Sequence, residues 1–399
     1  MTRRPLHALL LPPECAGRML DALAAALDGT GPAVLPLDPA LPRARLDALL
    51  GQFAPTAFET PEGTQCRTAG TGEDAGVPAD VAVVVATSGS TGEPKGVQLS
   101  AAALRHSASA SLRRIGATPG QRWLCPLPTS HIAGIGVLVR SLVSGTTPVV
   151  TGRLDPGERN LSQLGCANVS LVPTQLRRLL AAKADLDTFA TILLGGAAAP
   201  ASLLAQAHAA GARVVTTYGM TETCGGCVYN GHPLDGVSVR TGDDGHIQIA
   251  GPVLFSGYHR TASQPSVLDG TWFTTSDLGS VDGTGQLTVL GRADEMIITG
   301  GEKVAPAAVV AALESSPMVR EAAVIGEPDP EWGQRVTAVI VPADPAAPPS
   351  LADLRAYVRR HLPPAAAPRA LIAVPAIPLL PSGKPDLVEL HKLGQSTLT

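Results

Sequence analysis

Residues 81–100 read VAVVVATSGSTGEPKGVQLS and combine an apolar run with a loop suited to binding an anion. The six apolar residues from Val81 to Ala86 are typical of a strand buried in a sheet. Residues 87–96 then contain four hydroxyl side chains, three glycines and one lysine. Glycines let backbone N–H groups approach a bound anion, and hydroxyls add donors. The residues predicted to contact phosphate are Thr87, Ser88, Gly89, Ser90, Thr91, Gly92 and Lys95.

This loop differs from the phosphate loop of P-loop NTPases. There a Gly-Lys-Ser/Thr sequence opens a helix, whereas Lys95 here follows a proline and precedes Gly96. We expect positive φ at Gly89, Gly92 and Gly96, and a loop that closes over the phosphates. The alternative is a solvated Gly/Ser turn, which the density of donors after a buried strand disfavours.

Composition limits the class of protein. A chain of 399 residues is long enough for two or more domains. The formal net charge of −4 argues against a nucleic-acid-binding surface, so a small-molecule partner is expected. No apolar run reaches the length of a membrane helix, and the early apolar run is interrupted by Pro12 and Pro13, which disfavours an export signal. Six scattered cysteines indicate no disulfide framework and favour the cytoplasm.

The order of strand-like and helix-like segments predicts an α/β protein. Strand-like runs alternate with helix-like runs up to residue 241, which indicates mostly parallel sheets with crossover helices. From Gly242 onward, Asp-Gly turns indicate antiparallel hairpins and a β-rich subdomain. The last 105 or so residues have their own α+β pattern, with a helix opened by Pro306. We predict a large domain over 1–293 and a small C-terminal domain over 294–399, joined by a hinge.

Cys224 and Cys227 form one CxxC pair. Such a pair occurs in thiol-redox sites and in zinc sites. No second CxxC or HxxxH motif supplies further ligands, so we favour two structural cysteines.

Five motifs occur in an order that is typical of one superfamily. They are TSGSTGEPKG at 87–96, YGMTE at 218–222, FTTSD at 273–277, GRADEMIITGGEKV at 291–304 and PSGK at 381–384. The chain resembles the adenylate-forming superfamily, which includes acyl-CoA synthetases, luciferases and the adenylation domains of peptide synthetases. The resemblance implies that a carboxylate and ATP give an acyl-adenylate and pyrophosphate, after which the acyl group passes to a thiol.

The resemblance assigns roles at the nucleotide. Glu222 and Thr91 would bind Mg²⁺, Asp277 would accept hydrogen bonds from the ribose hydroxyls, and Arg292 would make a second nucleotide contact. Ser276 replaces the glycine that usually precedes this aspartate in the family. The remaining residues implied at the adenine nucleotide are Gly195, Gly196, Tyr218, Gly219, Met220 and Thr221.

The resemblance also assigns roles near the C-terminus. Lys384 would stabilise the charge that develops during adenylation, and Asp294 would be the hinge about which the small domain rotates between the two half-reactions. Gly300, Gly301 and Lys303 would face CoA, although Lys303 stands where the family often has asparagine.

The acid substrate is predicted from the amino-acid sequences of the motifs and from the short length of the segment before residue 87. In these two features the chain resembles the compact actinobacterial form of the 2-succinylbenzoate-CoA ligase family of menaquinone biosynthesis. His131 would lie at the acyl pocket, with a packed histidine as the alternative. Arg140 is a candidate for the carboxylate that does not react, with an arginine on a helix surface as the alternative.

Three alternatives remain open on the sequence alone. They are another aryl- or acyl-CoA ligase, a nucleotide-binding module without catalysis, and a remote thiol-redox protein built on the CxxC pair. A homo-oligomer is also compatible with the sequence.

Overall fold

The computed structural model describes residues 2–66, 76–88, 94–152, 154, 161–259, 268–269, 271–380 and 385–396. The chain forms two compact units. Unit 1 comprises residues 1–196, 207–239 and 249–274, and unit 2 comprises residues 197–206, 240–248 and 275–399. The predicted hinge at Asp294 concerns motion, and it stays a prediction.

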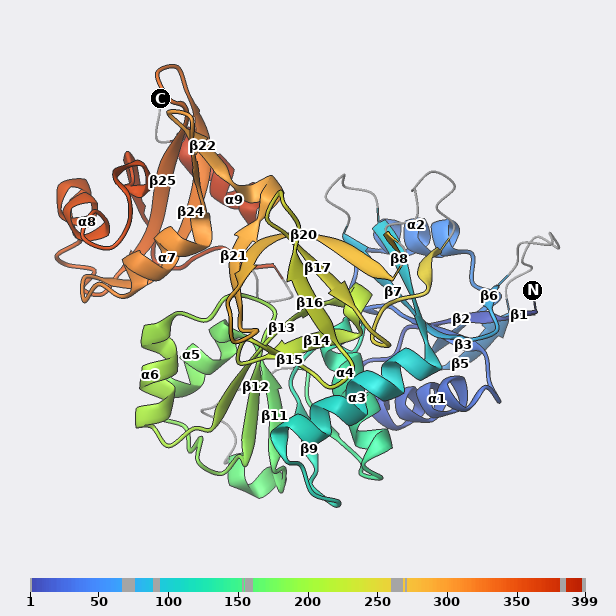
Figure 1. Ribbon diagram of the computed structural model, residues 1–399. Helices are drawn as coiled ribbons and strands as arrows, with labels where there is room; N and C mark the ends of the chain where they lie inside the picture. Colours follow the sequence, from blue (N-terminus) through green and yellow to red (C-terminus); the bar gives the residue numbers. More distant parts are fainter. Residues whose placement is uncertain are drawn as a thin grey trace. The chain divides into compact units, whose positions relative to one another are not determined.

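Unit 1 contains a seven-stranded sheet in the order β10-β9-β11-β12-β13-β14-β15 (Figure 1). Strands β10 to β13 are parallel, and β14 and β15 continue the sheet antiparallel. The parallel part consists of β9 (Trp123–Cys125), β10 (Val149–Val150), β11 (Asn168–Leu171), β12 (Thr191–Leu194) and β13 (Val214–Met220). The antiparallel part consists of β14 (Gly225–Tyr229) and β15 (His232–Pro233). This sheet confirms the strands predicted from the apolar runs between residues 149 and 220.

A second seven-stranded sheet has the order β18-β8-β7-β3-β2-β4-β5. Its strands are β2 (Leu6–Leu9), β3 (Ala33–Pro36), β4 (Ala57–Thr60), β5 (Gly63–Cys66), β7 (Val81–Ser88), β8 (Pro94–Ser100) and β18 (Gly257–His259). The early apolar run is therefore a buried strand, since β2 pairs in parallel with both β3 and β4. β7 and β8 pair antiparallel, so the predicted phosphate loop joins two strands of a hairpin. A short two-stranded pair, β1 (Arg3–Arg4) with β6 (Val77–Pro78), lies apart from both sheets.

Three helices fill the space between these two sheets. They are α1 (Ala16–Asp28), α3 (Ala101–Ile115) and α4 (Ile132–Val143). α1 packs on β3 and β7, α4 packs on β9, and α3 contacts both β8 and β14. Ser100 begins α3 as its N-cap, because the side chain accepts a hydrogen bond from the N–H of Ala103 at 3.1 Å. Three further helices precede residue 210 in the described part of the chain: α2 (Arg43–Phe53), α5 (Pro173–Ala181) and α6 (Ala201–Ala209).

A third sheet has the order β16-β17-β20-β19, with β21 paired to β20. It consists of β16 (Ser238–Thr241), β17 (His246–Ala250), β19 (Leu268–Asp269), β20 (Trp272–Val281) and β21 (Leu287–Arg292). Two predicted hairpins are confirmed here, because short turns join β16 to β17 and β20 to β21.

A fourth sheet forms the core of unit 2, in the order β23-β22-β25-β24 with β26 parallel to β25. Its strands are β22 (Ile297–Thr299), β23 (Glu302–Val304), β24 (Val319–Asp329), β25 (Gly333–Pro342) and β26 (Ala370–Ala373). Its helices are α7 (Pro306–Glu314), α8 (Leu351–Val358) and α9 (Leu387–Ser396). Short 3-10 helices occur at η1 (Pro13–Cys15), η2 (Leu161–Leu164), η3 (Thr221–Thr223), η4 (Ala293–Glu295) and η5 (Pro364–Ala366). The predicted fold class of mixed sheets, crossover helices, a β-rich part and an α+β C-terminal part is confirmed.

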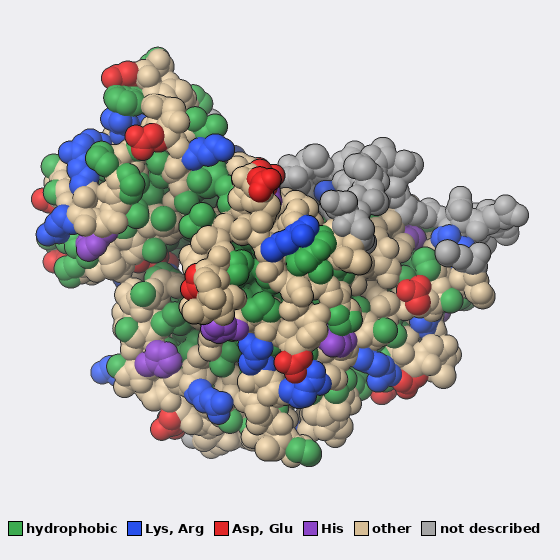
Figure 2. Space-filling view, viewed as in Figure 1, with side chains coloured by type: hydrophobic (Ala, Val, Ile, Leu, Met, Phe, Trp, Pro, Cys, Tyr) green, Lys and Arg blue, Asp and Glu red, His purple; other side chains and the backbone are tan. Residues whose placement is uncertain are grey.

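Charged side chains lie interspersed on the face of the molecule drawn in Figure 2. Blue basic and red acidic groups alternate there and do not gather into one basic area. No helix within the described ranges combines the length and apolar character needed to cross a bilayer. All six cysteines are free thiols, as the absence of a disulfide framework in the sequence predicts.

Candidate functional site

The carboxyl end of β12 runs directly into a segment of backbone without side chains. Leu194 pairs with Thr216, and Gly195 and Gly196 follow directly. A Cβ atom at Gly195 would lie 2.3 Å from Oγ1 of Thr217, so only glycine fits. Gly196 has φ of +84°, which also favours glycine. The backbone after β12 thus lies without side chains at the carboxyl edge of the parallel strands, where such sheets commonly bind ligands.

The YGMTE motif begins in β13 and ends in η3, where Thr223 fixes its shape. Tyr218 precedes a bulge in the pairing of β13 with β14, and Gly219 comes directly after it. A Cβ atom at Gly219 would lie 2.0 Å from the carbonyl oxygen of Gly225. The buried Thr223 hydroxyl accepts from the N–H of Met220 at 2.9 Å and lies 2.7 Å from that same carbonyl oxygen. The turn that carries Thr221 and Glu222 is therefore rigid.

Glu222 is held at its backbone and at its carboxylate by one segment. The N–H of Phe255 donates to the carbonyl oxygen of Glu222 at 2.9 Å. The hydroxyl of Tyr258 donates to Oε1 of Glu222 at 2.8 Å. Burial, followed by the charge of Glu222 and this hydrogen bond, raises the pKa of Tyr258 above its usual range.

Lys95 lies on β8 and faces the same tyrosine. Its Nζ atom is 5.5 Å from the ring centroid of Tyr258, within the range of a cation–π contact. The neighbouring Thr87 lies opposite Lys95 in the hairpin and donates from Oγ1 to its carbonyl oxygen at 3.3 Å. We call Lys95, Tyr258 and Glu222 the phosphate-side cluster. Two of its members are predicted from the sequence, and the structure brings them to one tyrosine.

Sequence reasoning missed Tyr258, because its role depends on a pairing between distant segments. β18 pairs antiparallel with β8, and this places Tyr258 opposite Val97 and His259 opposite Gly96. The only signal in the sequence is a tyrosine after a Ser-Gly pair in PVLFSGYHR, which is also common in ordinary turns.

The expectation of positive φ at Gly96 is wrong. Gly96 lies within β8, and φ at this residue is outside the positive range. Glycine is needed there for space, because a Cβ atom would lie 2.8 Å from the ring of Phe53 and 3.1 Å from Cβ of His259. The end of α2 supports the hairpin next to this contact, since Gln52 donates to the carbonyl oxygen of Pro94 at 2.6 Å.

Several predicted site residues lie outside the described residues. Ser88 is described by its backbone alone, which pairs with Pro94. The residues outside the described part of the chain are Gly89, Ser90, Thr91, Gly92 and Lys384. Leu379 and Pro385 form an antiparallel bridge on either side of the segment that contains Lys384.

The predicted acid-binding residues lie on α4. His131 is the N-cap residue of this helix and is exposed. Gly134 is buried, and a Cβ atom there would lie 2.3 Å from the carbonyl oxygen of Pro128, so the glycine three residues after His131 lets the helix pack under the preceding turn. The site of His131 is therefore a solvent-facing helix start beside a close backbone contact.

Arg140 is half-buried, so the interpretation as an arginine on a helix surface is wrong. Its guanidinium carbon lies 4.5 Å from the ring centroid of Trp123, and Nη2 donates to Oγ of Ser170 at 3.0 Å. Its Nε atom is buried and has no hydrogen-bond partner. Among the described residues no carboxylate forms an ion pair with Arg140, and burial lowers the pKa of its guanidinium. A half-buried cation with no acidic partner among the described residues is suited to an anionic ligand.

Cys224 and Cys227 are buried structural cysteines. Burial raises the pKa of the Cys227 thiol to about 12 and that of the Cys224 thiol further still. Reactive thiols have lowered pKa values, so this geometry disfavours redox chemistry. Within the described residues no three His, Cys, Asp or Glu side chains gather into a metal site.

Unit 2 brings together three of the predicted residues, which we call the arginine group: Asp277, Arg292 and Asp294. Asp277 pairs with Arg292 across β20 and β21. Arg292 donates from Nε and Nη2 to the two carboxylate oxygens of Asp294, at 2.8 and 2.7 Å. These hydrogen bonds raise the pKa of Arg292 and lower that of Asp294. The predicted nucleotide contact and the predicted hinge residue are thus partners of each other.

Gly300 and Gly301 form the tight turn between β22 and β23. Their φ values are +59° and +82°, as a two-residue hairpin turn with two positive φ angles requires. A Cβ atom at Gly300 would lie 2.8 Å from the ring of Trp332, and the N–H of Gly300 donates to the carbonyl oxygen of Trp332 at 2.9 Å. Lys303 is exposed on β23. The turn is firmly held by Trp332, a contact that the sequence did not suggest.

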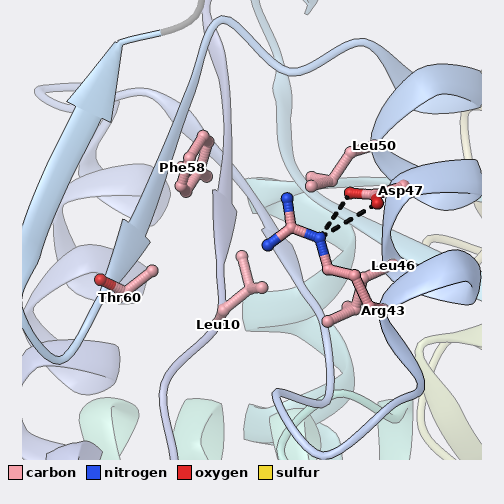
Figure 3. Close-up of a pocket in the computed structure, with 7 residues that line it drawn as sticks. All are labelled: Leu10, Arg43, Leu46, Asp47, Leu50, Phe58 and Thr60. Atoms are coloured by element: carbon pink, nitrogen blue, oxygen red, sulfur yellow. Dashed lines mark hydrogen bonds and ion pairs between the residues drawn. The ribbon is translucent and has the colours of Figure 1, made fainter.

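A cavity of about 430 Å³ lies between α2 and the end of β4 (Figure 3). Arg43 and Asp47 of α2 line one side, and Phe58 of β4 lines the other. Arg43 pairs with Asp47 at 3.0 Å, and its side chain is 88% exposed. This cavity is a surface depression and carries none of the predicted chemistry.

Comparison with known families gives two matches. A family model described as "AMP-binding enzyme" matches residues 47–259. A second, described as "AMP-binding enzyme C-terminal domain", matches residues 308–384.

Named relatives and solved structures resemble the chain over most of its length. The "Probable 2-succinylbenzoate--CoA ligase" of Mycobacterium tuberculosis H37Rv is 48% identical over 323 residues, 78% of this chain and 84% of that protein. The 2-succinylbenzoate–CoA ligase of Bacillus licheniformis is 36% identical over 341 residues, 79% of this chain and 70% of that protein. The o-succinylbenzoate CoA synthetase of Bacillus subtilis, solved with the acyl-adenylate OSB-AMP, superposes with a TM-score of 0.81 at 28% identity, covering 96% of this chain and 87% of that one. The same enzyme, solved with ATP and magnesium ion, gives a TM-score of 0.80 at 27% identity, covering 96% and 88%.

Proposed function

Because the chain belongs to the AMP-binding enzyme family, we propose that it is an AMP-forming ligase that joins 2-succinylbenzoate to CoA. In the first step, a carboxylate oxygen of the acid attacks the α-phosphate of ATP and pyrophosphate leaves. In the second step, the CoA thiol attacks the acyl-adenylate and AMP leaves. Support for this acid comes from the relatives named 2-succinylbenzoate–CoA ligase and from the B. subtilis enzyme solved with OSB-AMP.

The observation that carries the proposal is the phosphate-side cluster. An anionic carboxylate must approach an anionic phosphate in the first step, so the protein's main task is to neutralise charge and to position the reactants. Lys95 supplies a cation on the phosphate hairpin, and Glu222 supplies an oxygen ligand at the end of β13. Gly195 and Gly196 follow β12, which pairs with β13, and their backbone carries no side chain that would obstruct the adenine base of ATP.

The residues present suit a Mg²⁺ ion that arrives with ATP. Mg²⁺ prefers oxygen ligands and is commonly bound by one or two carboxylates together with substrate phosphates. Oε1 of Glu222 accepts the Tyr258 hydroxyl, which leaves Oε2 for the ion. Thr91 is proposed as the second protein ligand. When bound, Mg²⁺ would neutralise phosphate charge.

The acid is proposed to lie near His131 and Arg140 of α4. 2-Succinylbenzoate carries a second carboxylate that does not react, and Arg140 is a half-buried guanidinium without an acidic partner among the described residues. A guanidinium binds a carboxylate through two parallel hydrogen bonds, which favours a dicarboxylate over a monocarboxylate.

Residues of unit 2 are proposed to serve both steps. Asp277 would bind the ribose, and Arg292 would contact the nucleotide. Lys384 would stabilise the first transition state, and rotation about Asp294 would then present the turn at Gly300 and Gly301, with Lys303, to CoA.

A substrate panel tests the proposal. Pyrophosphate release is measured with ATP, Mg²⁺ and a set of acids that contains 2-succinylbenzoate, benzoate, succinate and malonate, and thioester formation is then followed after CoA is added. We expect kcat/KM to be highest for 2-succinylbenzoate, and Arg140→Met to remove most of its advantage over benzoate. Equal rates for all the acids would contradict the assignment of the substrate, and an absence of pyrophosphate release would contradict the proposed reaction.

A further inference from the structure

Tyr258 contacts both charged members of the phosphate-side cluster. Its hydroxyl donates to Glu222 at 2.8 Å, and its ring lies under the Lys95 ammonium at 5.5 Å. No ion pair links Lys95 to Glu222 in the part of the chain that the structure describes. One aromatic side chain therefore contacts both charges through two different parts of its surface.

We propose that Tyr258 is a positioning residue that orients the Glu222 carboxylate for Mg²⁺ while keeping the Lys95 ammonium apart from it. A lysine and a glutamate next to each other would otherwise form an ion pair, and the pair would satisfy both charges before ATP arrives. The phenol gives the carboxylate a hydrogen bond and gives the ammonium a π face, and neither contact cancels a unit charge. This role rests on the proposed function, because it concerns how the site receives MgATP.

The position of Tyr258 is well defined by its surroundings. β18 pairs with β8, the strand that carries Lys95, so the tyrosine and the lysine are tied to the same ladder. The Tyr258 ring also packs against the buried ring of Phe255, with centroids 5.0 Å apart. The N–H of Phe255 binds the backbone of Glu222, so one short segment determines the position of the tyrosine and of its acceptor.

Two substitutions separate the contacts of Tyr258. Tyr258→Phe keeps the ring and removes the hydroxyl, whereas Tyr258→Leu removes both. Binding of MgATP, and of ATP with excess EDTA, is measured by calorimetry for each full-length variant. We expect Tyr258→Phe to weaken MgATP binding about tenfold with little effect on metal-free ATP, because a hydrogen bond to a charged group is lost. Tyr258→Leu is expected to weaken both.

Tyr357 provides the matched control. Its hydroxyl donates to the carbonyl oxygen of Ser315 in unit 2, at 3.0 Å, so Tyr357→Phe loses a comparable hydrogen bond away from the cluster and should bind MgATP like the wild type. Thermal unfolding is measured for every variant to confirm folding. If wild type binds MgATP and a folded Tyr258→Phe protein binds it equally well, the role of Tyr258 is wrong and the proposed function stands. If wild type does not bind MgATP, the proposed function itself is wrong.

Discussion

The phosphate-side cluster of unit 1 and the arginine group of unit 2 use similar side chains but are held in different ways. The cluster joins segments far apart in the chain. Tyr258 donates a hydrogen bond to Glu222, which lies 36 residues earlier, and its ring contacts Lys95 on β8. The arginine group is local, because Arg292 binds a carboxylate two residues away on the surface. The first arrangement exists only when the whole unit is folded. The second can exchange one partner for another at little cost.

This difference suggests a division of work between the two units. A preorganised cluster is suited to stabilising charge, because it does not have to reorganise during the reaction. A surface pair between an arginine and a nearby aspartate is suited to a hinge, because its contacts are weak and solvent can replace them. We therefore expect substitutions in unit 1 to affect both folding and adenylation, and those in the arginine group to affect mainly the change between steps.

The largest effect is expected for Lys384→Ala, which asks whether this lysine of unit 2 acts in only one of the two steps. Loss of an ammonium that stabilises the developing charge should reduce adenylation on the order of 10²- to 10³-fold. Thioester formation from a supplied acyl-adenylate should change little. Lys392→Ala is the control, because Lys392 is exposed and its described ion pair is with Glu389 of the same helix. An equal loss in both half-reactions would remove the division of work.

The next effect is on stability and concerns the rigidity of the YGMTE turn. Gly219→Ala places a Cβ atom 2.0 Å from the carbonyl oxygen of Gly225, so a backbone strand must move. We expect the free energy of unfolding to fall by about 3 kcal/mol, as in other overpacked sites. Gly283→Ala is the control, since nothing lies within 4 Å of its added Cβ atom and φ there is not positive. Denaturant unfolding measures both, and equal stabilities would show that the turn adapts.

A smaller effect is expected for Glu222→Gln, which removes the negative charge of the cluster and keeps its shape. Adenylation should fall by about 30-fold, equivalent to about 2 kcal/mol, and the Mg²⁺ concentration for half-maximal rate should rise. Glu389→Gln on the exposed face of α9 serves as the control. An unchanged Mg²⁺ dependence would show that Glu222 is not a ligand of the ion.

The sequence predicted the individual helices, strands and site residues of the two regions better than the contacts between distant elements. The strand at 81–86 and the helix opened by Pro306 have local signals, and both are confirmed. Tyr258 and the burial of Arg140 could not be predicted, because they depend on the pairing of β18 with β8 and on the packing of α4 against Trp123. A periodic pattern specifies an element, but it does not specify which distant element packs against it.

The smallest effect is expected for Asp294→Asn. The pH dependence of its free energy of unfolding tests the local ion pair between Arg292 and Asp294. Hydrogen bonds from Arg292 lower the pKa of Asp294 below its unfolded value near 4. A lowered pKa means that the pair stabilises the folded state above the unfolded pKa, and that this contribution is lost as pH falls through the folded pKa. Both side chains are exposed, by 40% and 46%, so screening by solvent should limit the contribution to under about 1 kcal/mol.

Denaturant unfolding of wild type and Asp294→Asn should therefore differ slightly at pH 7 and converge as the pH falls below about 4. Asp386→Asn is a suitable comparison, because Asp386 binds only backbone N–H groups among its described side-chain partners. At pH 7 the transfer of the acyl group to CoA should slow more than adenylation in Asp294→Asn, since a hinge matters between the steps. A stability loss of several kcal/mol at pH 7, or one that does not shrink as the pH falls, would mean that the arginine group is structural, and the contrast with the phosphate-side cluster would then be wrong.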